Sequence, residues 1–353
     1  MDHNEAFISA AQSASLERFE ATHTAPSNIA LVKYWGKHAS QLPANASISF
    51  TLSEAHTRSN VRFEKSSIPK VQVTFDGVPT PAFEPKVEQF LDRIRLYCPF
   101  LSGYSLHIST SNTFPHSSGI ASSASGLAAL AMAVVSLEFA LGGIREGDKK
   151  IKASFLARLG SGSAARSIEG PLVSWGEHIE LPNSSDLYGT RFEQAHEVFT
   201  SFQDTILIVH KGSKKVSSTL GHSLMDHHIF KEARFEQAST HMSALVHALK
   251  KGHLERFIAI VESEALSLHA MMMTSTPYFI LMEPQTLEII KAIWNFREST
   301  AIPLCFTLDA GANVHLLYPE HSKERVHEFI DEQLKKHCED QMLIMDRCGL
   351  GAK

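Results

Sequence analysis

The sequence is poor in cysteine. Only four occur among 353 residues, and Cys98, Cys305, Cys338 and Cys348 lie far apart without a CxxC pair. This spacing argues against a structural zinc site and against a disulfide framework, and it favours a reducing compartment. We therefore expect a cytoplasmic protein.

An excess of basic charge and a membrane-spanning segment are also lacking. Lys and Arg number 33 against 38 Asp and Glu, for a net charge of −5, and no basic block stands out. The longest apolar run, 127–141, contains Ser136 and Glu138 and is short for a bilayer span. The N-terminus has Asp2 and Glu5 where a signal peptide has basic and then apolar residues. We expect neither a nucleic-acid nor a membrane partner.

Several familiar catalytic signatures are missing as well. The sequence contains no GxxxxGK[ST], GxGxxG, GxSxG or HExxH pattern. This excludes the usual P-loop, dinucleotide-binding, hydrolase and zinc-protease motifs. Any phosphate or carboxylate chemistry must come from other loops.

The content of apolar residues, 43%, predicts an ordinary globular protein with a substantial core. Runs typical of strands dominate the first part, at 28–36, 46–53, 57–64, 71–77 and 104–110, and helical periodicity dominates after residue 230. Helices are expected over 85–97, 147–160, 230–252, 253–273, 283–300 and 322–338. The fold class is therefore α+β, with domains at 1–200 and 201–353.

A serine-rich loop precedes the most apolar predicted helix. Gly119 frees the backbone there, and Ser122, Ser123 and Ser125 offer hydroxyls where the unpaired amides of the helix point outward. Such a place attracts phosphate. The alternative is a close-packed helix entry in which small residues only let backbones approach each other.

Two further segments combine small polar residues with a cation. The segment GSGSAARSIEG, 160–170, holds Ser161, Gly162 and Ser163 before Arg166, a set suited to a carboxylate or a phosphate. The alternative is a flexible connection with a solvated arginine.

The segment KYWGK follows an apolar run and holds Lys33, Tyr34 and Lys37. Its two lysines can neutralise a multiply charged anion, although lysines on an exposed strand edge have the same pattern.

In FTLDAGANV, Asp309 stands between two apolar runs, where a carboxylate is costly to bury unless it is paired or functional. A turn-forming Asp-Ala-Gly is the rival explanation. The segment KGSKKVSST, with Ser218, predicts a basic surface turn.

Taken together, these segments resemble the mevalonate diphosphate decarboxylases of the GHMP kinase superfamily. The matching pieces are APSNIALVKYWGK (25–37), NASISFTL (45–52), FPHSSGIASSASGLAAL (114–130), GSGSAARSIEG (160–170), SKKVSST (213–219) and FTLDAGAN (306–313). They occur in family order along nearly the whole chain. The resemblance implies a ribosomal-S5-like N-terminal domain, a ferredoxin-like helical C-terminal domain and a site between them.

The resemblance also implies a reaction and roles for residues. ATP with Mg²⁺ would phosphorylate the 3-hydroxyl of (R)-5-diphosphomevalonate, which then loses phosphate and CO₂ to form isopentenyl diphosphate. Asp309 matches the catalytic aspartate, Lys33 a lysine near it, and Arg166 the arginine that holds the substrate carboxylate. Further substrate contacts are implied for Tyr34, Lys37, Ser161, Gly162, Ser163 and Ser218. ATP phosphates are implied at Gly119, Ser122, Ser123 and Ser125, with Ser123 also near the metal.

Four positions depart from the family pattern, namely Ala46, His222, Tyr278 and Ala312. None removes a charged group that the chemistry needs, but they leave the length of the substrate's phosphate chain open. A decarboxylase of mevalonate 5-phosphate and a mevalonate-type kinase are the alternatives within the superfamily. A catalytically silent sensor of nucleotides or isoprenoid precursors is a third alternative. Family members are commonly homodimers, which we expect here.

Overall fold

The computed structural model describes residues 4–13, 15–115, 120–212 and 218–353, and it confirms the α+β class. The strands are β1 Arg18–Val32, β2 Ser47–Lys65, β3 Val71–Phe75, β4 Val78–Pro79, β5 Tyr104–Asn112, β6 Leu172–Trp175, β7 Thr190–Arg191, β8 Gln203–Leu207, β9 Cys305–Leu308, β10 Val314–Tyr318 and β11 Leu343–Arg347. The α-helices are α1 Glu84–Ile94, α2 Ser122–Ala140, α3 Lys149–Gly160, α4 Ser218–Ser223, α5 Lys231–Lys251, α6 Leu254–Met273, α7 Pro284–Thr300 and α8 Lys323–Phe329.

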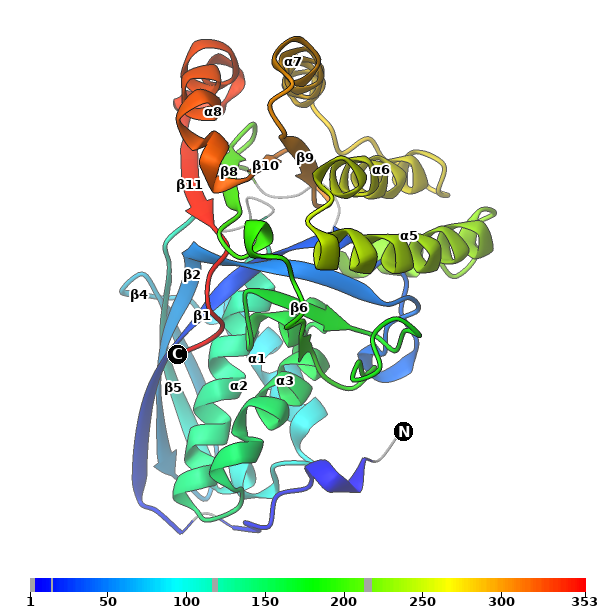
Figure 1. Cartoon of the computed structure of the whole chain (residues 1–353). Helices are drawn as coiled ribbons and strands as arrows, with labels where there is room; N and C mark the ends of the chain where they lie inside the picture. The colour runs from blue at the N-terminus through cyan, green and yellow to red at the C-terminus, as the bar shows by residue number, and fades with distance from the viewer. Residues whose placement is uncertain (1–3, 14, 116–119, 213–217) are drawn as a thin grey trace.

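A sheet in the order β4-β3-β5-β2-β6-β7, with β1 also paired to β2, forms the first part of the molecule (Figure 1). The runs 46–53 and 57–64, expected as separate strands, are one strand, β2. Its first six residues are all buried and its remainder alternates between buried and partly exposed positions. Side chains alternate between the faces of a strand, so this change shows that both faces are covered near Ser47 and only one farther along.

Helices α1, α2 and α3 cover one face of this sheet (Figure 1). Nearly every residue of α2 is apolar or small, and α2 packs against β1, β2 and α3. By length and composition α2 could cross a membrane, but 72% of its apolar window is buried inside the protein. It is therefore a core helix, which explains its apolar character on all sides.

A second sheet, in the order β11-β8-β10-β9, has α7 and α8 beside it (Figure 1). Helices α5 and α6 pack over the other face of the first sheet, where Phe50 meets Phe202 and Phe257. One apolar cluster thus joins residues before and after position 200. The expected final helix, 322–338, is broken after Phe329 by a π-helical turn, Ile330–Leu334.

The C-terminal segment returns to the first sheet. Strand β11, which the sequence did not predict, pairs with β8, and the chain then runs back along β1 and β2. Gly349 N–H donates to Thr51 O at 2.8 Å, and Lys353 and Thr24 exchange two backbone hydrogen bonds of 2.9 Å. The final residues therefore pack on the part of the chain assigned to the N-terminal domain, and the division at residue 200 stays a prediction.

Candidate active site

The end of β1 lies against the turn between β9 and β10. Lys33, directly after β1, is only 2% exposed, and its Nζ donates to Ala30 O at 2.7 Å and lies 3.7 Å from Asp309 Oδ1. Burial lowers the pKa of Lys33 to about 8, although the nearby carboxylates of Asp309 and Glu264 act in the opposite direction. The sequence alternative of an exposed edge lysine is therefore wrong. A buried cation of reduced pKa beside a carboxylate, 29% exposed, is a typical catalytic arrangement.

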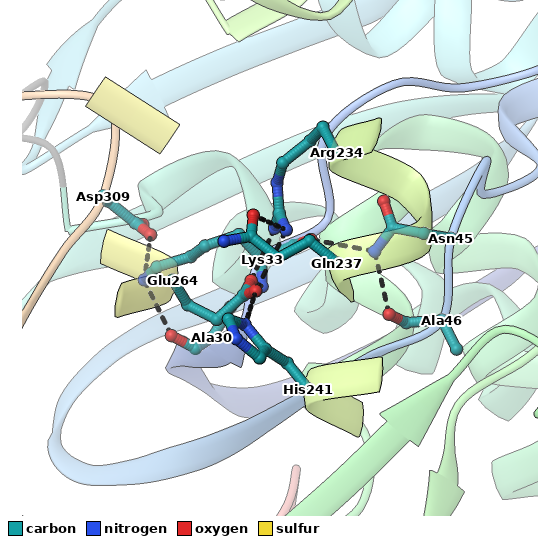
Figure 2. A network of polar contacts seen from close by, with 9 residues as sticks. All are labelled: Ala30, Lys33, Asn45, Ala46, Arg234, Gln237, His241, Glu264 and Asp309. Carbon is teal, nitrogen blue, oxygen red and sulfur yellow. Dashed lines mark hydrogen bonds and ion pairs between the residues drawn. The ribbon is translucent and has the colours of Figure 1, made fainter. Parts of the chain in front are cut away.

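A second carboxylate, Glu264 on α6, holds the backbone of Lys33 (Figure 2). Glu264 Oε2 accepts from Lys33 N–H at 2.8 Å, and Arg234 on α5 donates to both of its oxygens, at 3.0 and 2.5 Å. His241 Nδ1 lies 2.6 Å from Oε1. These donors outweigh the effect of burial and lower the pKa of Glu264, so the carboxylate is charged.

Arg166 lies in a 3₁₀ turn, η6 Gly162–Ser167, and is also buried. Its Nε donates to Ser49 Oγ at 2.8 Å and one terminal nitrogen to Ser47 Oγ at 2.5 Å. Two neutral hydroxyls do not balance its charge, and burial lowers its pKa to about 10, while Asp309 raises it. A buried guanidinium whose direct partners are both neutral is suited to bind an anion.

Tyr34 contacts three aromatic or small neighbours. Its ring lies 4.7 Å from that of Trp175 and 4.3 Å from that of His222. Burial raises the pKa of its hydroxyl, so Tyr34 stays neutral. A Cβ added at Gly162 would lie 2.7 Å from Trp175 and 2.9 Å from Tyr34 Oη, which shows why the turn needs glycine here.

His222 on α4 closes this side of the site. Gly36 N–H donates to His222 Nδ1 at 3.1 Å, so its other nitrogen carries the proton. Burial, together with Lys37 and Arg166, lowers the pKa of His222 to about 3 and keeps it neutral. Lys37 is half-buried, and its Nζ donates to Gln41 at 2.9 Å. Burial lowers the pKa of Lys37 as well.

The predicted phosphate loop leads into α2. Ala121 has a positive φ of 42°, and the half-buried Ser122 and Ser123 occupy the first positions of the helix, where its amides are unpaired. Ser125 points elsewhere: it is fully buried, and its hydroxyl lies 2.6 Å from Thr57 Oγ1. We therefore replace the predicted phosphate contact of Ser125 by a packing role. Gly119 lies outside the described residues.

Lys33 Nζ lies 3.7 Å from Asp309 Oδ1, and the negative charge of Asp309 raises the pKa of both Lys33 and Arg166. Ser161 and Ser163 flank Gly162 and are half-buried. Asn28 donates to Ser163 O at 3.1 Å and fixes this turn. Ser218 begins α4, and its side chain lies outside the described atoms.

Several important side chains escaped the sequence analysis. The sequence did contain a usable signal for Ser47 and Ser49, because residues two positions apart lie on the same face of a strand. Glu264, Arg234 and His269 lie within ordinary amphipathic helices and had none. Buried His269 donates to Asp309 O at 3.1 Å, and burial lowers its pKa to about 4, so it positions the turn while neutral.

This arrangement has definite chemical abilities. It offers one carboxylate beside a cation, a buried guanidinium for an anionic group, and a helix N-terminus for phosphate. Among the described residues, no group of three or more His, Cys, Asp or Glu side chains is arranged to hold a metal ion. A site with these groups suits proton transfer and phosphoryl transfer on an anionic substrate.

Two family models match most of the chain. The model of the diphosphomevalonate decarboxylase-like N-terminal domain matches residues 25–186, and that of the mevalonate 5-diphosphate decarboxylase C-terminal domain matches 205–348. A diphosphomevalonate decarboxylase of Candida albicans is 30% identical over 87% of this chain and 86% of its own length. A phosphomevalonate decarboxylase of Haloferax volcanii is 28% identical over 85% of this chain and 88% of its own.

Solved structures agree in fold. MDDEF in complex with MVAPP, AMPPCP and magnesium has a TM-score of 0.82 and 28% identity, covering 95% of this chain and 98% of that one. The mevalonate diphosphate decarboxylase of Staphylococcus aureus has a TM-score of 0.83 and 27% identity, with the same coverage. The two-domain GHMP kinase architecture expected from the motifs is confirmed.

Proposed function

Because this chain belongs to the diphosphomevalonate decarboxylase family, we propose that its site converts (R)-5-diphosphomevalonate, with ATP, into isopentenyl diphosphate, CO₂, ADP and phosphate. The single observation that supports the reaction most directly is the juxtaposition of Lys33, Arg166 and Asp309. The enzyme thereby acts in the mevalonate pathway of isoprenoid biosynthesis.

Asp309 acts on the 3-hydroxyl of the substrate. This tertiary hydroxyl is a poor leaving group, so it first attacks the γ-phosphorus of ATP while Asp309 orients it and accepts its proton. The Lys33 ammonium lies 3.7 Å from Asp309 Oδ1 and faces this carboxylate. A charged carboxylate is the form that can accept the proton.

Arg166 holds the substrate carboxylate. Its planar guanidinium binds a carboxylate through two parallel hydrogen bonds and so fixes the C–C bond that breaks. When that bond breaks, its electron pair forms the new double bond, and phosphate leaves from the neighbouring carbon. Ser47 and Ser49 hold the guanidinium in place for this step.

The remaining groups fit the two phosphate chains. Lys37, Tyr34, Ser161 and Ser163 border the substrate diphosphate, and the start of α2, with Ser122 and Ser123, borders the phosphates of ATP. Magnesium supplies charge neutralisation on those phosphates when bound, and it is usually held by one or two carboxylates together with phosphate oxygens. The Ser123 hydroxyl, at the start of α2, is the side chain that suits it here.

A second substrate has support from one relative. The phosphomevalonate decarboxylase of Haloferax volcanii matches over 85% of this chain, so decarboxylation of mevalonate 5-phosphate is the alternative. One or two contacts to the second phosphate decide between these substrates. A mevalonate-type kinase is the other alternative, in which phosphorylation occurs without loss of CO₂.

The test is to incubate the purified protein with Mg-ATP and, separately, mevalonate, its 5-phosphate and its 5-diphosphate, following ADP and CO₂. Equal release with the diphosphate alone is the expected result. Equal release with the monophosphate instead would change the substrate, and ADP without CO₂ would indicate a kinase. Release of neither ADP nor CO₂ with any of the three substrates would refute the proposal and favour a sensor.

We also propose a cytoplasmic homodimer. The four cysteines are free thiols, which supports a reducing compartment. Light scattering after size-exclusion chromatography would test the dimer, since a mass near 39.0 kDa would refute it.

A further inference from the structure

We propose that Glu264 is a positioning residue for this reaction, because its buried carboxylate fixes the backbone of Lys33 and places a second negative charge near the Lys33 ammonium. The inference rests on the proposed function for its kinetic consequences. Its physical basis, the coupling of Glu264 to Lys33, does not depend on which substrate is used.

The first argument is the number of donors that Glu264 satisfies. Its side chain has no exposed surface, and its two oxygens accept from Lys33 N–H, from both terminal nitrogens of Arg234 and from His241 (Figure 2). These donors come from the end of β1 and from α5, while Glu264 itself lies on α6. A carboxylate so fully bonded stays charged and in one orientation.

The second argument concerns the Lys33 main chain. Its N–H donates to Glu264 at 2.8 Å, and its C=O accepts from Asn45 Nδ2 at 3.0 Å, so both sides of the residue are held. The side chain then reaches Ala30 O and Asp309 from a fixed base. Loss of Glu264 would free one side of this support, and the ammonium would lose its fixed distance to Asp309.

The third argument is the charge balance around the ammonium. Four titratable groups face it: Asp309 after β9, Glu264 and His269 on α6, and Arg166 in η6. Asp309 and Glu264 raise the pKa of Lys33, Arg166 lowers it, and His269 is neutral. Because the pKa of Lys33 lies at about 8, removal of either carboxylate should shift the charge of Lys33 within the pH range in which activity can be assayed.

The chain contains a matched control on the same helix. Glu262 is also buried and also accepts from an arginine, with Arg297 donating to it at 2.6 and 3.1 Å and Trp294 at 2.8 Å. It faces α7 and not Lys33. Glu262→Gln therefore removes a comparable buried ion pair from α6 without touching the proposed support.

The experiment compares the full-length wild type with Glu264→Gln and Glu262→Gln. The titration of Lys33 is followed by NMR on protein labelled with ¹³C at lysine Cε, and its resonance is assigned by its absence in Lys33→Arg. In parallel, kcat and KM are measured with whichever of the three mevalonate substrates the wild type turns over. Glu264→Gln should lower the Lys33 midpoint by about one pH unit and kcat by on the order of 10- to 100-fold.

The control should leave the midpoint and kcat of the wild type in place, even if its melting temperature falls. Equal effects of the two substitutions would overturn the inference, because they would reflect general loosening of α6. An unchanged midpoint and kcat in Glu264→Gln would also overturn it while the function stands. If the wild type turns over no substrate, the proposed function fails, and the NMR midpoints still decide the coupling.

Glu264→Asp separates position from charge and replaces Glu264→Gln should that variant not fold. It keeps a negative charge facing Arg234 but is one methylene shorter, so it cannot reach all of the donors. We expect a lower kcat with a Lys33 midpoint close to that of the wild type. A wild-type kcat in this variant would refute the positioning role.

Discussion

The buried ammonium of Lys33 predicts an activity that is sensitive to alkaline pH. This ammonium is 2% exposed, and burial lowers its pKa from 10.5 to about 8 despite the carboxylate 3.7 Å away. A group with this pKa is about 90% charged at pH 7 and about 10% charged at pH 9. We therefore predict that kcat/KM for the mevalonate substrate falls about tenfold per pH unit above pH 8, because only the charged form supports Asp309.

The assay is coupled ADP release at substrate concentrations well below KM, from pH 6 to 10. The slope of kcat/KM reports groups of the free enzyme, and the substrate carboxylate and phosphates are fully ionised above pH 8. The neutral phenol of Tyr34 cannot produce the fall, because burial raises its pKa. Arg166 adds a second fall near its pKa of about 10.

Lys37 is the remaining candidate, since burial lowers its pKa too. The control is therefore Lys37→Arg, which makes the charge at position 37 permanent. The midpoint near pH 8 should persist in this variant. A kcat/KM that stays constant up to pH 9.5 in the wild type would refute the assignment of the fall to Lys33. Loss of the fall near pH 8 in Lys37→Arg would refute it as well.

Asp309→Asn should abolish turnover while calorimetry still detects binding of ATP and substrate; normal turnover would mean that Asp309 is not the base. Arg166→Ala should lower the rate of CO₂ release more than nucleotide binding, and unchanged kinetics would remove Arg166 from the site. Gly162→Ala should cost about 1–3 kcal/mol of unfolding free energy, because the new methyl group would lie 2.7 Å from Trp175, which urea denaturation measures. His222 and His269 are buried and neutral, with pKa values of about 3 and about 4, so folding stability should be full above pH 6.5 and decrease as the pH falls toward 4; a melting temperature constant over that range would contradict this.

Much of the fold could be predicted because it depends on local patterns. The periodicity of α3, α5, α6 and α7 placed these helices within a few residues of their observed bounds. Strand β11 was missed because Leu343–Arg347 is short and is stabilised by distant parts of the chain, through pairing with β8 and hydrogen bonds from β2 to Asp346. The join between the two halves of β2 was missed for a related reason, since polar residues interrupt its apolar alternation.

The site likewise has features that the sequence predicts and features that depend on the tertiary structure. Motif order alone indicated the family, the class of reaction and the trio Lys33, Arg166 and Asp309, because the residue types that bind phosphate and carboxylate are few and stand in recognisable loops. The residues next to Lys33 in the sequence do not show that its side chain is only 2% exposed. Only the packing of α5 and α6 over the first sheet put Glu264 behind Lys33, and only that burial lowered the pKa of its ammonium. Desolvation depends on every element that surrounds a charge, so the tertiary structure alone could decide it.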